Sequence, residues 1–225
     1  MVVVPDHLCG VGPNDSHCSA RLSLQNRRRH VMSERSIRSA KVSEAERCLA
    51  VLTLAFAGDP AARWAWPDQQ QYLDAFPRFG RAFGGDAVDA GTAHYVEGFS
   101  GVALWLPPGT PPDEASLVRV IEDTVADERK HAMFSMFEQM DTYHPHEQHW
   151  HLPLIGVDPV SQGRGYGSAL LSRALDECDR QQVLAYLEAT SPRNVPLYER
   201  HGFEVLGTIQ VGTSPPVFPM ARKPR

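Results

Sequence analysis

A glycine-rich segment at residues 157–168 constrains the fold of this chain more than any other stretch. It reads VDPVSQGRGYGS and lies between an apolar run that ends near Val157 and an amphipathic run that starts near Ser168. Because glycine has no Cβ, consecutive backbone N–H groups can turn into one concavity, and a following helix adds its own unpaired N–H groups and positive dipole end. Such an arrangement binds a pyrophosphate. The segment therefore predicts a strand, an anion-binding loop and a helix.

The spacing of the glycines excludes two common phosphate-binding loops. No Gly-Lys-Ser/Thr follows them, as a Walker loop requires, and Ser168 stands where the dinucleotide-binding fingerprint needs its third glycine. The pattern that fits is Gln-x-x-Gly-x-Gly, with Gln162, Gly165 and Gly167 at its fixed positions.

A second motif, ATSPRNVPLYERHGF, occupies residues 189–203. Asn194 is a suitable N-cap for a short helix, and Gly202 suits the position just beyond its last turn. Together the two motifs resemble the signatures of the GNAT superfamily of N-acetyltransferases. Within that superfamily, the chain from Leu54 onward is similar to puromycin N-acetyltransferases, densely over its last third and in patches before it.

The resemblance implies a fold and a co-substrate. The fold would be α/β, of the α+β kind, with a mixed, mostly antiparallel central sheet of about six to seven strands, flanked by helices and splayed in the middle. The co-substrate would be acetyl-CoA. The residues that would bind it are Ile155, Gly156, Val157, Gln162, Gly163, Arg164, Gly165, Tyr166, Gly167, Ser168 and Asn194.

The resemblance also implies how these residues act. Strand backbone groups would pair with the pantetheine amides, Gly156 would let the arm pass close, and the loop N–H groups would hold the pyrophosphate. Asn194 would bond the pantetheine arm, or act only as an N-cap. Arg164 is equally compatible with a charge-assisted contact and with a solvated side chain. Tyr198 is the expected general acid for the departing thiolate, and packing in the core is its alternative role.

The general base, which accepts the proton of the attacking amine, is less well marked. Glu138, Asp141, His149 and His151 all lie before or on the strand at 149–157. Glu138 is favoured because a carboxylate that faces an apolar cleft has its pKa raised, although an exposed helix position is the other interpretation. His149 and His151 would share a strand face, as metal ligands do, but no third ligand has motif spacing, so no metal is predicted.

Composition limits the partners and the compartment. A net charge of −5 gives no positive electrostatic field that would attract nucleic acid, and no apolar run reaches the length of a membrane span. Cys9, Cys18, Cys48 and Cys178 lack CxxC spacing, which suits reduced thiols in a cytoplasmic protein. Residues 1–35 show no helical or strand period and are predicted to be a disordered extension, with a native start near Met32 as the alternative. Residues 36–225 are predicted to be one N-acetyltransferase domain.

Hydrophobic periodicity predicts the remaining elements. Helices are expected at 43–57, 72–83, 113–140, 168–179 and 194–201. Strands are expected twice within 92–106, and at 149–157, 183–189, 203–211 and 217–222. The aromatic residues Trp64, Trp66, Phe76 and Trp105 belong either to the core or to the wall of a pocket for an apolar amine.

The expected function is the acetyl-CoA-dependent acetylation of a primary amine on a small molecule, with an aminonucleoside antibiotic as one candidate acceptor. The alternatives are a protein N-terminal or lysine acetyltransferase, and a non-catalytic regulatory module that binds coenzyme A.

Overall fold

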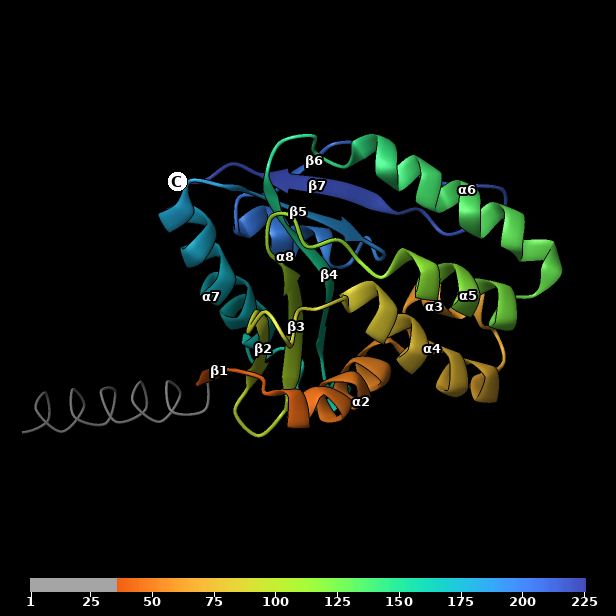
Figure 1. Cartoon of the computed structure of the whole chain (residues 1–225), viewed down its shortest axis with the longest axis horizontal. Helices are drawn as coiled ribbons and strands as arrows, with labels where there is room; N and C mark the ends of the chain where they lie inside the picture. The colour runs from red at the N-terminus through yellow and green to blue at the C-terminus, as the bar shows by residue number, and fades with distance from the viewer. Residues whose placement is uncertain (1–35) are drawn as a thin grey trace, which may run out of the picture. The chain divides into compact units, whose positions relative to one another are not determined.

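A computed structural model describes residues 36–225, which form a seven-stranded sheet with helices on both faces (Figure 1). The strand order is β1-β2-β3-β4-β5-β7-β6. Neighbouring strands are antiparallel except for the parallel pair β4 and β5. The prediction of a mixed, mostly antiparallel sheet is confirmed, whereas the expectations for residues 1–35 lie outside the described part. The strands are β1 (Ile37–Ser39), β2 (Ala93–Val96), β3 (Gly101–Leu106), β4 (His149–Val157), β5 (Leu184–Ala189), β6 (Glu204–Val205) and β7 (Phe218–Arg222).

The helices divide the interior into two hydrophobic cores. One core lies between the sheet and α2, α4, α5 and α6, and the other lies between the sheet, α7 and α8. Within residues 36–225, no helix combines the length and the apolar character needed to cross a bilayer. The helices are α2 (Ala45–Phe56), α3 (Pro60–Ala65), α4 (Gln69–Gly84), α5 (Glu114–Thr124), α6 (Asp127–Tyr143), α7 (Tyr166–Gln181) and α8 (Val195–Arg200), with 3-10 turns η1 (Val42–Glu44) and η2 (Pro159–Ser161).

The parallel strands β4 and β5 separate partway along their length. Their pairing runs from His149–Leu184 to Leu152–Leu187, beyond which residues 154–157 pair only with β3 and residues 188–189 only with β7. The register against β3 also shifts, because Leu104 faces Leu154 while Leu106 faces His151, which places an extra residue in β4. Pro153 lies in this bulge and has no N–H to donate. The predicted splay in the middle of the sheet is confirmed.

The predicted helix at 113–140 is wrong as a single element, because the chain breaks between α5 and α6. Thr124, the last residue of α5, accepts a hydrogen bond on Oγ1 from Trp66 Nε1 at 3.0 Å and one on its carbonyl oxygen from Gln71 Nε2 at 2.6 Å. The next residue, Val125, is buried and extended. Contacts from α3 and α4 thus end α5, and no local sequence signal marks them.

The predicted strand at 203–211 is also shorter than expected. Only Glu204 and Val205 pair with β7, followed by an isolated bridge between Ile209 and Val217. Between them the backbone of Gly207 passes against Tyr143 at the end of α6, so closely that a Cβ there would lie 2.4 Å from the tyrosine hydroxyl. The end of α6 therefore occupies the space beside this part of the chain.

A buried ion pair joins the end of α7 to β7. The Arg222 guanidinium donates two hydrogen bonds of 2.8 Å to the Asp179 carboxylate and a third, of 2.9 Å, to the His201 carbonyl. The side chain of Arg222 is 4% exposed. The hydrogen bond from Arg222 lowers the pKa of Asp179.

Replacing Asp179 with asparagine should lower the free energy of unfolding by about 3 kcal/mol at neutral pH, because the buried guanidinium loses its counter-charge. The pKa of Asp179 is lower in the folded protein than in the unfolded chain. The ion pair therefore stabilises the folded protein fully above the unfolded-state pKa of about 4, and this stabilisation is lost as the pH falls through the folded-state pKa. Urea unfolding at neutral and acidic pH measures both effects. Glu177→Gln is the matched control, because Glu177 is 29% exposed, much as Asp179 is, but its partner Arg180 is 70% exposed. An Asp179→Asn curve that overlays the wild type would contradict the argument.

Candidate active site

The loop between β4 and α7 presents a run of backbone N–H groups without acceptors. Gly163 and Gly165 have φ angles of 74° and 81°, and α7 begins directly after Gly165, two residues earlier than predicted. Within residues 36–225, no acceptor is recorded for the N–H groups of residues 163–168, and the first paired N–H is that of Ala169, which donates to Gly165 at 3.1 Å. This is the geometry of an anion-binding loop at a helix N-terminus.

Several side chains of this loop are already engaged. Tyr166 is buried in the core beneath α7, and Ser168 Oγ lies 2.6 Å from Nε2 of His201. Gln162 donates through Nε2 to the Val157 carbonyl at 3.2 Å. These residues therefore offer an anion mainly their backbone, whereas the Arg164 side chain is exposed and has no recorded ion pair within residues 36–225.

The structure gives a different reason for Gly156 from the one expected. A Cβ at this position would lie 2.6 Å from the Ala55 Cβ and 3.2 Å from a methyl group of Leu52. Both residues are on α2, so this glycine lets α2 pack closely on β4. This packing is enough to explain a glycine at position 156, without the expected passage of a pantetheine arm.

A narrow cavity of about 80 Å³ lies where β4 and β5 separate. Asn194 and Tyr198 line it from the α8 side, and Glu188 lines it from β5. Asn194 occupies the N-cap position of α8, but its side chain makes no capping hydrogen bond. Much of the remaining wall is apolar, and it includes Trp66 and Phe76, whereas Trp105 lies in the core beneath α7 and Trp64 packs at the edge of the other core.

Tyr198 is suited by its surroundings to donate a proton. Its side chain is only 5% exposed, and no hydrogen bond is recorded for its hydroxyl within the described residues. Burial, with a smaller contribution from the Asp59 carboxylate, raises the pKa of the Tyr198 phenol. The phenol is therefore protonated at neutral pH.

Asp59 ties the two walls of the narrow cavity together. Its Oδ1 accepts hydrogen bonds of 3.0 Å from the N–H groups of Ala61 and Ala62, and its Oδ2 accepts one of 2.6 Å from Thr190. It thus caps α3 and holds that helix to the loop after β5. Burial raises the pKa of the Asp59 carboxyl despite these hydrogen bonds.

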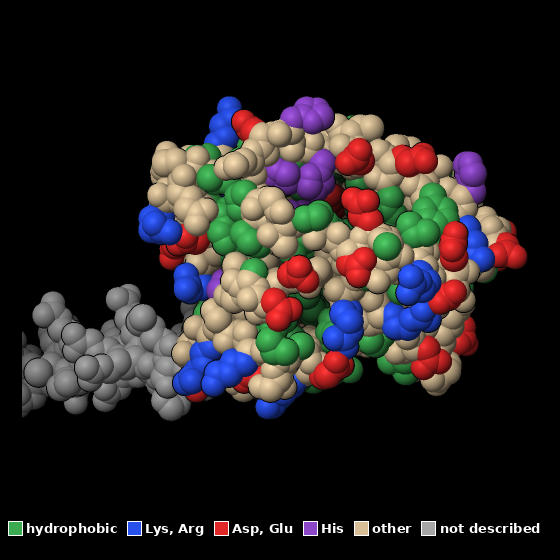
Figure 2. All heavy atoms as spheres, viewed as in Figure 1, with side chains coloured by type: hydrophobic (Ala, Val, Ile, Leu, Met, Phe, Trp, Pro, Cys, Tyr) green, Lys and Arg blue, Asp and Glu red, His purple; other side chains and the backbone are tan. Residues whose placement is uncertain are grey.

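A wider cleft of about 770 Å³ adjoins the narrow cavity. The two share Phe83, Phe137, Met140 and Glu188 in their walls. In Figure 2, histidine side chains are gathered on the visible face beside acidic and apolar side chains. Residues 144–149, which lead into β4, form one side of this cleft.

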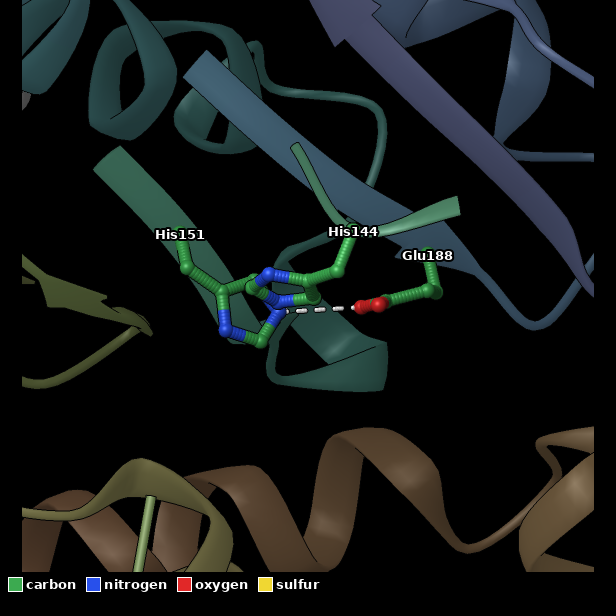
Figure 3. A group of neighbouring side chains, drawn as sticks. All are labelled: His144, His151 and Glu188. Atoms are coloured by element: carbon green, nitrogen blue, oxygen red, sulfur yellow. Dashed lines mark hydrogen bonds and ion pairs between the residues drawn. The ribbon is translucent and has the colours of Figure 1, made fainter. Parts of the chain in front are cut away.

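Glu188 and His151 form a buried pair in the wall between β4 and β5 (Figure 3). His151 Nε2 lies 2.9 Å from Glu188 Oε2, and the two side chains are 6% and 5% exposed. The pair forms because His151 is in register with Tyr186, so that Glu188, two residues further along β5, points to the same face. The second nitrogen of His151, Nδ1, is buried without a partner within the described chain.

The electrostatics of this pair favour an ionised carboxylate. Burial alone would raise the pKa of Glu188, but the neighbouring His151, His144 and Tyr186 hold it below its usual range. Burial, together with His151, lowers the pKa of His144 to about 4. Glu188 is therefore ionised at neutral pH and has the charge state that a general base requires.

Sequence analysis missed Glu188. The signal was present, because a lone carboxylate in the apolar strand LAYLEA is rarely buried without a specific partner. By contrast, Glu138 lies exposed on α6 at the edge of the wide cleft, and Asp141 is exposed nearby. His149 lies beside His144, with ring centroids 4.6 Å apart. The structure therefore brings His149 and His151 together with Glu188, but leaves Glu138 outside the buried group.

The same side chains were tested as a metal site. His144, His151 and Glu188 each place one ligand atom within 4.8 Å of the others. However, the 2.9 Å contact already pairs His151 with Glu188, and Nδ1 of His151 has no acceptor to orient the ring as the second shell of a metal site does. The arrangement fits a proton-transfer pair better than a metal centre.

Comparison with known sequences agrees with the two motifs. Residues 118–205 match the family model described as an acetyltransferase (GNAT) domain. An uncharacterised N-acetyltransferase of Schizosaccharomyces pombe is 28% identical over 130 residues, or 49% of this chain and 53% of that protein. A mycothiol acetyltransferase of Beutenbergia cavernae is 45% identical over 53 residues, which cover 22% of this chain and 18% of that protein. The chain thus spans about half the length of the first relative and less than a fifth of the second. These names support the resemblance to the superfamily, not the narrower resemblance to puromycin N-acetyltransferases.

Solved structures extend the likeness over most of the described chain. A structure from Corynebacterium glutamicum, titled as histone acetyltransferase HPA2 and related acetyltransferase, is 28% identical with a TM-score of 0.61, covering 84% of this chain and 96% of that one. Arylalkylamine N-acetyltransferase 2 of Aedes aegypti, 12% identical with a TM-score of 0.59, covers 84% of this chain and 99% of its own, and shares the fold alone.

Proposed function

We propose that this chain is an acetyltransferase of the GNAT superfamily, whose domain model matches residues 118–205, and that it transfers the acetyl group of acetyl-CoA to a primary amine of a small molecule. The observation that carries the proposal is the position of Tyr198 and Glu188 on one cavity, at the point where β4 and β5 diverge. An acid and a base of opposite protonation state on one cavity are what acyl transfer to an amine requires.

Acetyl-CoA would approach along the loop end of the splay. The N–H groups of Gly163 to Ser168 would hold the pyrophosphate, whereas the Gln162 N–H donates to the Pro159 carbonyl. The exposed Arg164 side chain would add a charge-assisted contact. Within residues 36–225, the backbone groups of Ile155, Gly156 and Val157 that face away from β3 have no strand partner, which supports their pairing with the pantetheine amides. The Asn194 side chain, which makes no capping bond, would contact the same arm.

Acetyl transfer needs two proton movements. The amine nitrogen would bond to the thioester carbonyl carbon and lose a proton to Glu188, which His151 holds in place. The carbon–sulfur bond would then break as Tyr198 gives its phenolic proton to the departing thiolate. The proton on Glu188 returns to Tyr198 through solvent, so the products are an amide and the free thiol of coenzyme A. Glu138, at the edge of the wide cleft, is the alternative base.

Replacing Gly165 with alanine should raise the Kd for coenzyme A about tenfold, or about 1.4 kcal/mol. The φ angle of 81° strains any residue with a Cβ, and relaxation of the loop would displace the N–H groups that follow. Calorimetric titration with coenzyme A measures the change. Gly91→Ala is the matched control, because Gly91 has a φ of 71° and open space around it. Equal losses of affinity in the two variants would count against the loop as the binding site.

Release of the coenzyme A thiol from acetyl-CoA, followed with a panel of amines, tests the proposed function. The panel includes alkylamines, arylalkylamines, puromycin, and peptides with a free N-terminus or lysine. Turnover with small amines and not with peptides is the expected result. Turnover of peptides alone would mark a protein acetyltransferase, and binding of acetyl-CoA without any turnover would mark a regulatory module.

A further inference from the structure

The wide cleft carries an unbalanced negative charge. Glu114, Glu138, Asp141 and Glu147 line it near solvent, and Glu188 lines it at the buried end. No lysine or arginine from residues 36–225 is among its lining side chains, nor among those of the adjoining narrow cavity. The surroundings of the cleft therefore favour cationic ligands and disfavour anionic ones.

Two of the four histidines that line the cleft, His144 and His149, do not offset this charge at neutral pH. Burial, together with His151, lowers the pKa of His144 to about 4, and burial also lowers the pKa of His149. Both rings are therefore neutral where the carboxylates are ionised. In Figure 2 the histidines appear next to acidic side chains on the same face.

The two acidic ends of the cleft are joined by apolar wall. Phe83, Phe134, Phe137 and Met140 line it, and Phe83 and Met140 also reach the narrow cavity. Glu138 and Asp141 lie three residues apart on α6, and therefore on one side of the helix. An extended ligand would meet carboxylates at the mouth, apolar surface along its length, and Glu188 at the inner end.

The inner end has the character of a ligand site. Glu188 is 5% exposed, and the buried His151 Nδ1 has no hydrogen-bond partner within the described chain. Buried polar groups of this kind are rarely left unpaired unless a ligand or water completes them. This observation is independent of the exposed carboxylates at the mouth.

We propose that the acceptor carries a second cationic group, separated by an apolar segment from the amine that is acetylated. One amine would reach Glu188 while the other is held by Glu138 and Asp141 at the mouth. This inference rests on the proposed function for the acetylation step, but the binding of such a ligand does not depend on turnover.

Three acceptors with the same carbon chain test the proposal: hexamethylenediamine, hexylamine and aminohexanoate, which end in an ammonium, a methyl and a carboxylate group. The wild type should show the highest kcat/KM for the diamine and the lowest for aminohexanoate. In the double variant Glu138→Gln/Asp141→Asn, the ratio of kcat/KM for the diamine to kcat/KM for hexylamine should fall roughly fivefold, as expected for two partly screened charge pairs, whereas the loss of a base would lower both values alike. Asp176→Asn/Glu204→Gln removes the same charge from exposed positions that line neither cavity and is the matched control.

A binding measurement separates this inference from the proposed function. Calorimetric titration of the three amines into protein saturated with coenzyme A allows no transfer, and the diamine should again bind best and lose affinity only in the cleft variant. That result without any turnover would support the inference and refute the proposed function. Turnover of hexylamine and the diamine with equal efficiency, or an equal loss in the control variant, would overturn the inference alone.

Discussion

Replacing Glu188 with glutamine should lower kcat for amine acetylation by about 10²- to 10³-fold, while the Kd for coenzyme A changes little. Glutamine keeps the shape of the side chain and can still face His151 Nε2, but it cannot take a proton. Because its neighbours hold the pKa of Glu188 below the usual range, the wild-type carboxylate stays ionised until the pH falls through that lowered value. The deficit should therefore be constant from about pH 6 to about pH 8 and shrink only in stronger acid.

The same substitution at Glu138 identifies the alternative base. Glu138 is exposed on α6, whereas Glu188 lines the cavity that also contains Tyr198. Steady-state kinetics with one alkylamine, measured for both variants over the same pH range, compares them directly. A large loss of kcat in Glu138→Gln and none in Glu188→Gln would transfer the role to α6 and contradict the mechanism.

Replacing Tyr198 with phenylalanine should lower kcat by about 10²-fold and leave the affinity for coenzyme A nearly intact. The ring would still pack against Phe203, whose centroid lies 6.1 Å away, so the loss reports the missing proton donor rather than a disturbed core. Burial raises the pKa of the Tyr198 phenol, which keeps the wild-type proton in place at neutral pH. Single-turnover kinetics with calorimetric binding of coenzyme A separate the two quantities.

A second tyrosine provides the matched control for this substitution. Tyr95 on β2 stacks on Phe99 and lines neither cavity. Its hydroxyl donates a hydrogen bond of 3.2 Å to Glu44 Oε1. Tyr95→Phe should leave kcat unchanged. An unchanged kcat in Tyr198→Phe as well would remove Tyr198 from the mechanism.

The glycine loop and the pair of Asn194 and Tyr198, the proposed acid, could be identified from sequence because their signals are local. Positive φ angles at Gly163 and Gly165 are a property of the glycines themselves, and the helix that follows supplies N–H groups wherever it begins. Asn194 and Tyr198 are one helical turn apart, so their spacing alone places them on one side of α8. Such relations need no knowledge of the rest of the fold.

The proposed base, Glu188, could not be identified in the same way. His151 and Glu188 lie on different strands, and they meet only because β4 and β5 pair in parallel with His151 opposite Tyr186. A shift of one residue in that register would turn Glu188 to the other face. Glu138 was preferred because a carboxylate that faces an apolar cleft has its pKa raised, but whether α6 buries or exposes this side chain depends on tertiary packing.

The sequence by itself determined where most of the helices and strands lie and that a glycine loop with positive φ angles precedes α7, because these follow from periodicity and glycine conformation within a few neighbouring residues. The mixed sheet was implied by the resemblance to the GNAT superfamily. The tertiary structure alone decided where β4 bulges and leaves β5, which carboxylate is buried, and which cleft is acidic. These depend on strand register and on contacts between segments far apart in the chain, and short-range patterns do not encode them.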